Sequence, residues 1–301
     1  MSETQATPAE AAMTQARGHA SHGAAYAEVA ASTRPVLVAL DIDGTLLHED
    51  ESLSEGIVEA IRGAEAAGHT LMLATGRSWN TVERIMRELG LEPEYVVASN
   101  GAVVLRRDPA DASGYAPYQV ETFEPAAVLT LLREHLPDAR YMVERPDGRR
   151  MYTADIPEWE LGRAQQVPLE AMMEVAVSRV VVVSPRHDNG EFLRLVEGIG
   201  LHQVSYSVGF SSWLDIAPDG VNKGTALEQV RTWLGFAPAD VLVIGDGRND
   251  LEMFAWARNG GGRAYAMGQS PREVLDAATH VTARVGDGGA ARVLRELARG
   301  R

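Results

Sequence analysis

Hydrophobic runs alternate with amphipathic segments along much of this chain. Four apolar runs have the length of strands that are buried on both faces, at residues 36–40, 70–76, 95–101 and 240–247. Between several of them apolar residues recur at helical spacing and stop at a glycine, as Ile57, Ile61 and Ala64 do before Gly68. Strands that alternate with helices predict a parallel sheet with right-handed crossovers. We therefore expect an α/β fold.

The alternation breaks between residues 102 and 208. A polar section at 106–117, a helical pattern near 128–132 and an apolar run at 179–183 follow one another there without a regular strand–helix order. We expect an inserted α+β domain at 102–208, between two parts of one core domain at 34–101 and 209–301. Residues 1–33 carry few large apolar side chains, and we expect them to form a poorly ordered tail.

Composition narrows the class of protein. The 301 residues are 45% hydrophobic and 23% charged, which is typical of a soluble globular protein. The formal charge of −14 argues against nonspecific binding to nucleic acid or to an anionic membrane, because both need clustered positive charge. The chain has no cysteine, no apolar run of about 20 residues and no signal-peptide pattern. We expect a cytoplasmic protein.

Short polar clusters follow each of the four predicted strands. Each cluster contains a glycine that lets a ligand approach the backbone, and they lie at residues 41–45, 75–77, 99–101 and 245–250. Ligands of open α/β sheets bind beyond the carboxyl ends of the strands. A single Asp-Gly pair is also a common turn, but four clusters at one edge of a sheet indicate a site.

The acidic residues in these clusters point to a metal ion. Asp41 and Asp43 leave the first strand together, and Asp246 and Asp250 follow the last one. Two like charges about 4 Å apart repel by roughly 4 kcal/mol at an effective dielectric near 20. A bound cation resolves that conflict, and oxygen ligands without His or Cys favour Mg²⁺. Mg²⁺ in turn often accompanies phosphate.

The ordered set of motifs resembles the haloacid dehalogenase superfamily of phosphatases. Its four motifs are matched by DIDGTLL at 41–47, ATGR at 74–77, NKG at 222–224 and GDGRND at 245–250. SNGA at 99–102 and AMG at 266–268 narrow the resemblance to the Cof-type branch. The resemblance implies a Rossmann-like parallel-sheet core with an inserted α+β cap of the C2 type, located between the second and third motifs.

The resemblance also implies roles for the catalytic residues. Asp41 is expected to attack phosphorus and become an aspartyl phosphate. Asp43 is expected to protonate the leaving oxygen and later to activate the hydrolytic water. Thr75 and the Gly76 backbone would hold phosphate oxygens, and Lys223 would offset the negative charge on the phosphate and on the nucleophile.

The metal and the rest of the substrate contacts follow from the same resemblance. Asp246 would bind Mg²⁺ beside Asp41 and the backbone carbonyl of Asp43, with Asp250 supporting these ligands. Asn249 would contact the substrate phosphate. Two further candidates are Arg77 and Asn100, which are equally compatible with a salt bridge or a loop cap.

The expected activity is Mg²⁺-dependent hydrolysis of a small phosphorylated metabolite, such as a sugar phosphate or a phosphorylated cofactor. One alternative is a phosphomutase or phosphotransferase of the same fold, which passes the phosphoryl group to a hydroxyl instead of water. The other is a non-catalytic binding protein, against which the intact Asp41, Asp43, Lys223 and Asp246 argue. We expect the chain to bind neither nucleic acid nor a membrane, and the sequence does not distinguish a monomer from a homodimer.

Overall fold

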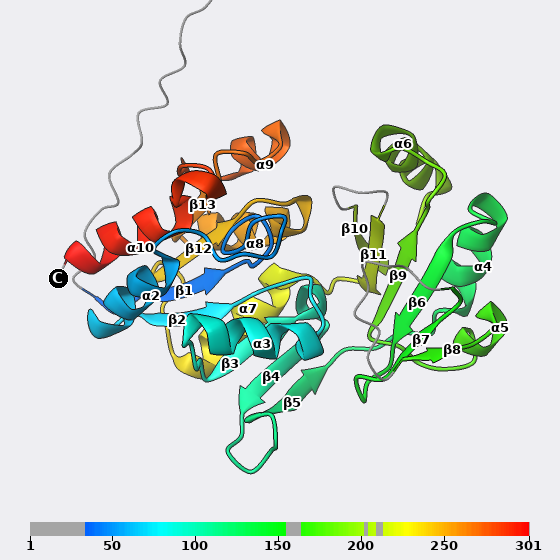
Figure 1. The fold of residues 1–301 in the computed structure, drawn as a ribbon, viewed down its shortest axis with the longest axis horizontal. Helices are drawn as coiled ribbons and strands as arrows, with labels where there is room; N and C mark the ends of the chain where they lie inside the picture. Colours follow the sequence, from blue (N-terminus) through cyan, green and yellow to red (C-terminus); the bar gives the residue numbers. More distant parts are fainter. Residues whose placement is uncertain (1–33, 155–163, 202–203, 209–212, 301) are drawn as a thin grey trace, which may run out of the picture.

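The computed structural model describes residues 34–154, 164–201, 204–208 and 213–300, which form two bodies side by side (Figure 1). We call them the core, which holds both ends of the described chain, and the cap. The tail expected at 1–33 lies outside the described residues.

The core contains a five-stranded parallel sheet in the order β14-β13-β12-β1-β2. Its strands are β1 (Leu37–Leu40), β2 (Thr70–Leu73), β12 (Val241–Gly245), β13 (Arg263–Ala266) and β14 (His280–Val281). All four pairings are parallel, and β1 lies between β12 and β2. The predicted α/β fold with a parallel sheet is confirmed.

Helices cover both faces of this sheet. They are α2 (Ile57–Ala66), α3 (Trp79–Leu89), α7 (Lys223–Leu234), α8 (Leu251–Asn259), α9 (Arg272–Ala277) and α10 (Gly289–Arg299). Successive β1 residues point to opposite sides, so Val38 and Leu40 pack with α2, α3 and α10, whereas Leu37 and Ala39 pack with α7, α8 and α9. This explains why the strand reads as one unbroken apolar run.

The third apolar run departs from the predicted arrangement. β3 (Tyr95–Ala98) meets the parallel sheet only through a bridge between Ala74 and Val97. It pairs instead with β4 (Val103–Arg107), which pairs with β5 (Tyr115–Val120), in a three-stranded antiparallel sheet. The bridge still brings the end of β3 beside the end of β2, so its polar cluster joins the others.

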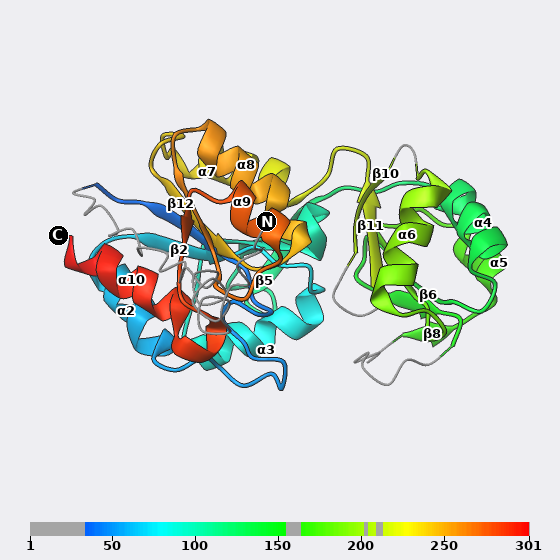
Figure 2. The ribbon, with the colours of Figure 1, turned by 90° about the horizontal axis from the view of Figure 1, so that it is seen from above.

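The cap is built on a six-stranded sheet in the order β10-β11-β9-β6-β7-β8. Its strands are β6 (Arg140–Glu144), β7 (Arg150–Tyr152), β8 (Gln165–Gln166), β9 (Arg179–Val183), β10 (Val204–Val208) and β11 (Trp213–Pro218). Helices α4 (Ala126–His135), α5 (Leu169–Met172) and α6 (Asn189–Ile199) cover one side. The other side of the sheet faces the core (Figure 2).

The strand pairing divides the chain differently from the expected cap at 102–208. β4 and β5 extend the core, where Val103, Leu105 and Tyr115 join the same hydrophobic cluster as α2 and α3. β11 belongs to the cap sheet, although it was expected in the core. The polar section at 106–117 therefore spans the turn of a core hairpin, and the chain crosses between the bodies near 121–125 and 218–222.

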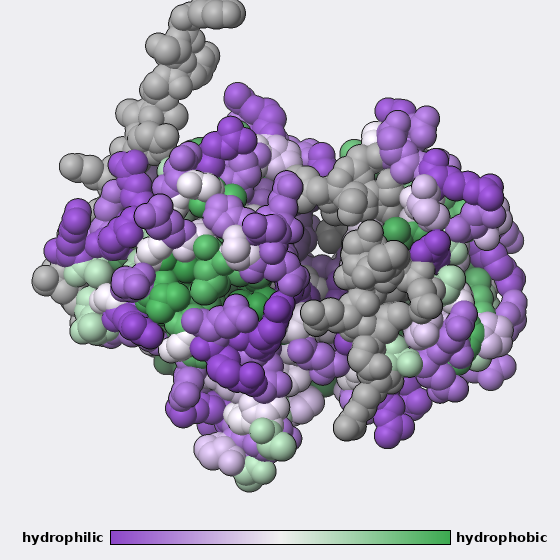
Figure 3. Space-filling model, viewed as in Figure 1, coloured by the Kyte–Doolittle hydropathy of each residue, from purple (hydrophilic) through white to green (hydrophobic). Residues whose placement is uncertain are grey.

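Hydrophilic residues cover much of the face shown in Figure 3, and a hydrophobic patch lies among them on the core. Among the described residues, no helix is both long enough and apolar enough to cross a lipid bilayer.

Candidate active site

Asp41, Lys223 and Asp250 form the buried centre of the site. Asp41 directly follows β1, and Lys223 is the first residue of α7. The Lys223 Nζ atom donates to Asp41 Oδ1 at 2.7 Å and to Asp250 Oδ1 at 2.7 Å. The side chain of Lys223 is 0% exposed, so these two carboxylates take the place of water around its charge. The structure thus brings together three residues from three separate motifs.

Local sequence explains why Lys223 starts a helix. Asn222 is the N-cap of α7: its Oδ1 accepts from Thr225 N at 2.9 Å, and Thr225 Oγ1 accepts from Asn222 N at 3.0 Å. This reciprocal capping box fixes the first turn. A cation at this end opposes the helix dipole, so the position is unfavourable for Lys223 without its carboxylate partners.

Asp246 adds a third carboxylate to this group. One oxygen each from Asp41, Asp246 and Asp250 lie within 4.8 Å of one another. Asp250 also accepts, through Oδ2, from the backbone N–H of Asp246 at 2.9 Å and of Gly247 at 3.0 Å. Both Asp250 oxygens are therefore engaged by the protein, which leaves Asp41 and Asp246 better placed to bind a ligand. Hard oxygen donors alone fit Mg²⁺ or a similar divalent cation.

Burial and the mutual charges of these groups shift their pKa values. Burial raises the pKa of Asp41 well above its ordinary value, and the carboxylates of Asp250 and Asp246 add to the effect against the opposing ammonium of Lys223. Burial and then the Asp250 charge raise the pKa of Asp246 to about 7. Burial alone would lower the pKa of Lys223, but Asp250 and Asp41 raise it above its ordinary range. One ammonium does not neutralise three carboxylates, and a bound cation would.

Two glycines make room for these carboxylates. Gly44 has a φ of 69°, a conformation that favours glycine, and a Cβ there would collide with the carboxylate of Asp246. A Cβ on Gly245 would collide in the same way with the side chain of Asp250. Gln269, which the sequence analysis missed, donates to the Gly44 carbonyl oxygen at 2.6 Å and so holds this loop in place.

Asp43 lies apart from the three buried carboxylates. Its side chain is 56% exposed and accepts from Arg77 Nε at 2.9 Å and Arg77 Nη2 at 2.5 Å. Arg77 also pairs with Glu51 at 3.0 Å, and both carboxylates raise its pKa. The salt-bridge interpretation of Arg77 therefore holds in this structure. Asp43 and Arg77 are held together at the rim, beside the buried group.

The second strand ends in the loop expected to hold phosphate. Thr75 is fully buried, and its Oγ1 accepts from the backbone N–H of Arg77 at 3.1 Å. Gly76 follows it, and a Cβ there would approach the Asn100 and Asn249 side chains to between 3.1 and 3.4 Å. α3 begins just beyond, with Ser78 as its N-cap. A helix start next to a glycine suits an anion.

Asn100 lies between the loop at Thr75 and Gly76 and the cap. Ser99 and Asn100 both have positive φ values, 49° and 52°, and Gly101 has one of 101°. Such conformations are costly for residues with a side chain and cluster at functional sites. Here they aim Asn100 so that its Oδ1 accepts from Asn249 Nδ2 at 3.1 Å and its Nδ2 donates to Asp215 Oδ2 at 2.8 Å.

The sequence analysis missed three charged residues that the cap contributes. Arg179 on β9 donates through Nε to Asp215 Oδ1 at 2.7 Å and through Nη2 to Asp215 Oδ2 at 2.6 Å, and both side chains are buried. Arg179 also reaches Ser78 of the core at 3.2 Å, and Ser78 in turn bonds to Glu144 of β6. A charged residue inside an apolar strand, such as Asp215 in WLDIAP, was the available signal.

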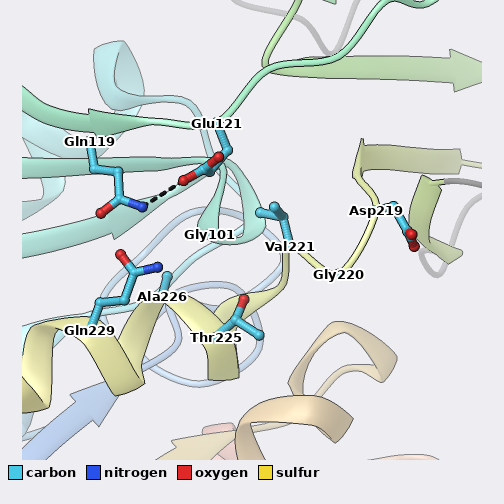
Figure 4. Close-up of a pocket in the computed structure, with 9 residues that line it drawn as sticks. All are labelled: Gly101, Gln119, Glu121, Asp219, Gly220, Val221, Thr225, Ala226 and Gln229. Atoms are coloured by element: carbon cyan, nitrogen blue, oxygen red, sulfur yellow. Dashed lines mark hydrogen bonds between the residues drawn. The ribbon is translucent and has the colours of Figure 1, made fainter.

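A separate small cavity lies away from these residues, where the chain crosses between the bodies (Figure 4). Its volume is about 110 Å³, below the roughly 300 Å³ at which ligand pockets begin. Glu121 and Asp219 come from the two crossings, and Gln119 donates to Glu121 at 2.6 Å. The cavity belongs to the connection between core and cap, not to the carboxylate group.

Comparison with known proteins gives this geometry a family. The model of the haloacid dehalogenase-like hydrolases matches residues 38–294, which is most of the chain and includes every residue of the carboxylate group. The chain belongs to this haloacid dehalogenase-like hydrolase family. The relatives that match it in this family are named as phosphatases, and the chain is an enzyme of that type.

Individual members resemble the chain over nearly their whole length. YxeH of Bacillus subtilis (strain 168) is 29% identical over 280 residues, which are 87% of this chain and 97% of YxeH. The 5-amino-6-(5-phospho-D-ribitylamino)uracil phosphatase YitU of the same organism is 25% identical over 280 residues, or 88% and 98% of the two chains. The solved structure of the subclass IIB sugar phosphatase BT4131 has a TM-score of 0.70 at 19% identity and covers 86% of this chain and 98% of its own. That last likeness concerns the fold.

Proposed function

We propose that this hydrolase is a Mg²⁺-dependent phosphatase that cleaves a small phosphorylated metabolite through an aspartyl phosphate on Asp41. The observation that supports this most directly is the buried group of Asp41, Asp246 and Asp250 around Lys223, at the carboxyl end of β1. Such a group combines a nucleophile, a cation and an oxygen site for a metal. Acid–base catalysis alone supplies only about 10²–10⁴-fold, far short of what phosphate ester hydrolysis requires.

Asp41 is the proposed nucleophile. Its Oδ1 accepts from Lys223, which fixes the direction of the carboxylate. In the first step a bond forms between an Asp41 oxygen and phosphorus while the bond from phosphorus to the leaving oxygen breaks. Lys223 offsets the negative charge that phosphate brings toward the carboxylate. Splitting the hydrolysis into two displacements replaces one slow step by two easier ones.

Asp43 is the proposed acid and base. Its side chain is exposed at the rim, where it is paired with Arg77. When the substrate is bound, the carboxyl group would protonate the leaving oxygen, and in the second step it would take a proton from the water that attacks phosphorus. Inorganic phosphate and the free Asp41 carboxylate result. Arg77 is then the group that holds Asp43 between turnovers.

Asp41 and Asp246, with the backbone carbonyl of Asp43, would hold the Mg²⁺ ion, and Asp250 would position them. The bound ion would supply positive charge beside the phosphoryl oxygens. Thr75 and Gly76 would hold those oxygens from the other side, with Asn249 next to them. Burial raises the pKa of Asp246 to about 7, and a bound cation would favour its ionised form.

The substrate class follows from the relatives and is a sugar phosphate or a phosphorylated cofactor. One relative is named for a phosphorylated ribitylaminouracil and one structural neighbour for sugar phosphates. We propose water as the acceptor of the phosphoryl group. Transfer to a sugar hydroxyl, the alternative from the sequence, gives a product phosphate ester without net phosphate release.

A phosphate-release assay tests the proposal. The purified chain is incubated with a panel of phosphorylated metabolites and Mg²⁺, with EDTA-treated protein and the Asp41→Asn variant alongside. We expect release that EDTA stops, that added Mg²⁺ restores and that the variant lacks. Phosphate release that EDTA does not reduce would contradict the metal dependence. Formation of an isomerised phosphate ester without free phosphate would indicate a mutase instead of a phosphatase.

A further inference from the structure

Gln269 lies on a turn just after β13, beside the carboxylate group. The turn closes where Ser270 N donates to the Met267 carbonyl oxygen at 3.0 Å, and Met267 N donates to the Gly245 carbonyl oxygen at 3.0 Å. Gly245 ends β12 and directly precedes Asp246. The turn is thus fastened to the strand end that carries a proposed metal ligand, and its backbone has little freedom to move away from it.

The side-chain amide of Gln269 has one defined orientation. The backbone N–H of Val285 donates to Gln269 Oε1 at 3.0 Å, and only the oxygen of an amide can accept this bond. Nε2 therefore faces the other way, where it donates to the Gly44 carbonyl oxygen at 2.6 Å and lies 3.4 Å from Asp246 Oδ2. The position needs an acceptor and a donor side by side, which an ionised carboxylate or an aliphatic side chain does not supply.

Asp246 is held from three directions. Its backbone N–H donates to Asp250 Oδ2 at 2.9 Å. Its Oδ2 atom lies so close to Gly44 that a Cβ added there would come within 2.0 Å of it. Gln269 Nε2 approaches the same oxygen. Together these contacts fix the rotation of the carboxylate, and hence the direction in which its other oxygen points.

The same amide holds the backbone after Asp43. The N–H of Gly44 donates to the Leu47 carbonyl oxygen at 3.0 Å, and it shares one planar trans peptide with the Asp43 carbonyl. The Gly44 carbonyl belongs to the next peptide, which Gln269 holds. Both peptide planes beside Gly44 are therefore oriented, although glycine is the residue with the most backbone freedom. One of these planes contains the carbonyl proposed as a metal ligand.

We propose that Gln269 is a positioning residue for the metal: its amide holds the Asp246 carboxylate and the peptide after Asp43 in the relative position at which both bind Mg²⁺. This rests on the proposed metal dependence and extends it to a residue outside the proposed ligand set. Mg²⁺ requires nearly ideal octahedral geometry, so a small rotation of one ligand lowers its affinity. Loss of a residue that orients metal ligands typically costs about 10–100-fold in metal affinity or activity.

Titration calorimetry with MgCl₂ tests this role. Gln269→Met keeps the length of the side chain and removes its hydrogen bonds. We expect the Kd for Mg²⁺ to rise about ten-fold, and phosphate release to fall at limiting Mg²⁺ and to recover largely at saturating Mg²⁺. Gln119→Met is the matched control, since Gln119 is also a partly buried glutamine that donates to a carboxylate, that of Glu121, away from the site. It should leave the Kd unchanged.

A second variant disturbs the orientation of the amide and leaves Gln269 itself intact. Val285 is the first residue of the short helix η3 (Val285–Asp287), and Arg284 before it is extended, with a ψ of 162°. Proline is compatible with both features, so Val285→Pro removes the N–H that Gln269 Oε1 accepts with little strain. We expect a smaller rise in the Kd for Mg²⁺, about three-fold. A merely structural role would instead lower the thermal midpoint of both variants and leave both Kd values unchanged, and that result overturns the proposal.

The titration also separates this inference from the proposed function. If the unaltered chain binds no Mg²⁺, the proposed metal dependence fails, and the positioning role fails with it. If the unaltered chain binds Mg²⁺ and Gln269→Met binds it equally well, only the positioning role is refuted, and the metal-dependent phosphatase stands.

Discussion

The carboxylate group of the core and the paired charges of the cap treat buried charge in opposite ways. In the core, Lys223 lies among three carboxylates, and the pKa values of Asp41 and Asp246 rise because both groups are buried and, to a smaller extent, because the other carboxylates are close. In the cap, Arg179 and Asp215 neutralise each other through two short hydrogen bonds. The first arrangement keeps an excess of negative charge that a bound cation would offset, and the second is neutral within the protein. The proposed catalytic residues thus lie where the buried charges are unbalanced, and the residues that attach the cap to the core lie where the charges are balanced.

Among these variants, we expect Asp41→Asn, which alters the carboxylate group of the core, to have the largest effect. We expect hydrolysis to fall by more than about 10⁴-fold, because the nucleophile is lost. The metal-free thermal midpoint should stay the same or rise, since the amide oxygen still accepts from Lys223 while one crowded negative charge disappears. Phosphate release and thermal unfolding measure the two effects. Asp138→Asn, at an exposed ion pair, is the control that should change neither, and retained turnover in Asp41→Asn would exclude Asp41 as the nucleophile.

Lys223→Met tests whether the ammonium of Lys223 stabilises the buried carboxylates of Asp41 and Asp250. Removing one partner of a buried ion pair typically costs about 3–5 kcal/mol, because the remaining charge stays buried. We expect a loss of that size in the free energy of unfolding, measured with urea without metal, together with loss of activity. The double variant Lys223→Met/Asp250→Asn should recover part of the stability, since Asp250 no longer carries an unpaired charge. A single variant as stable as the unaltered chain would show that Lys223 is not needed to balance the group.

Asp215→Asn breaks the balanced pair of the cap. Arg179 then loses its two-pronged carboxylate partner and keeps the neighbouring charge of Glu144, so we expect unfolding to become easier by about 1–3 kcal/mol, less than for Lys223→Met. The hydrogen bond with Asn100 links this site to the phosphate loop, so KM should rise several-fold while kcat changes less. Steady-state kinetics and urea unfolding provide the readouts. The control Arg186→Met breaks an exposed ion pair of the cap and should change neither KM nor stability. If Asp215→Asn has the same KM as the unaltered chain, Asp215 does not contribute to substrate binding.

The sequence predicted the core of the molecule much better than the cap. Asp41, Lys223, Asp246 and Asp250 lie in short motifs at strand ends or a helix start, where the parallel topology forces them to one edge of the sheet. The pairing of Asp43 with Arg77 depends on side-chain geometry at the rim, which no local pattern encodes. The same holds for the polar section at 106–117, which forms the turn and adjoining strand ends of a hairpin, because no local pattern shows which strands pair.

The cap illustrates the limit of pattern reading. The apolar run at 179–183 indicates a buried segment, but nothing in it shows that its first residue, Arg179, forms an ion pair. Its partner Asp215 is 36 residues away in sequence, and only the sheet order brings them together. Val180 and Val182 pack in the cap's hydrophobic core and Val181 lies on the other side of the sheet, yet in the sequence all three belong to one apolar run. Which of them faces the catalytic group becomes visible only in three dimensions.

The smallest expected effect is the change with pH of the unfolding free energy of the metal-free chain, which tests whether the negative charge at Asp246 is unbalanced. The pKa of Asp246 is raised to about 7 in the folded chain, above the ordinary value near 3.8 that the unfolded chain should show. Protonation therefore favours the folded state, and this contribution is complete below pH 3.8 and is lost as the pH rises through 7. Between pH 6 and pH 8 the metal-free chain should lose about 1 kcal/mol of unfolding free energy. Mg²⁺ should oppose the loss, because it stabilises the ionised carboxylate, and Asp246→Asn should remove this part of the slope. A metal-free chain that becomes more stable from pH 6 to pH 8, or a slope that Asp246→Asn leaves intact, would mean that the negative charge at Asp246 is already balanced without a metal.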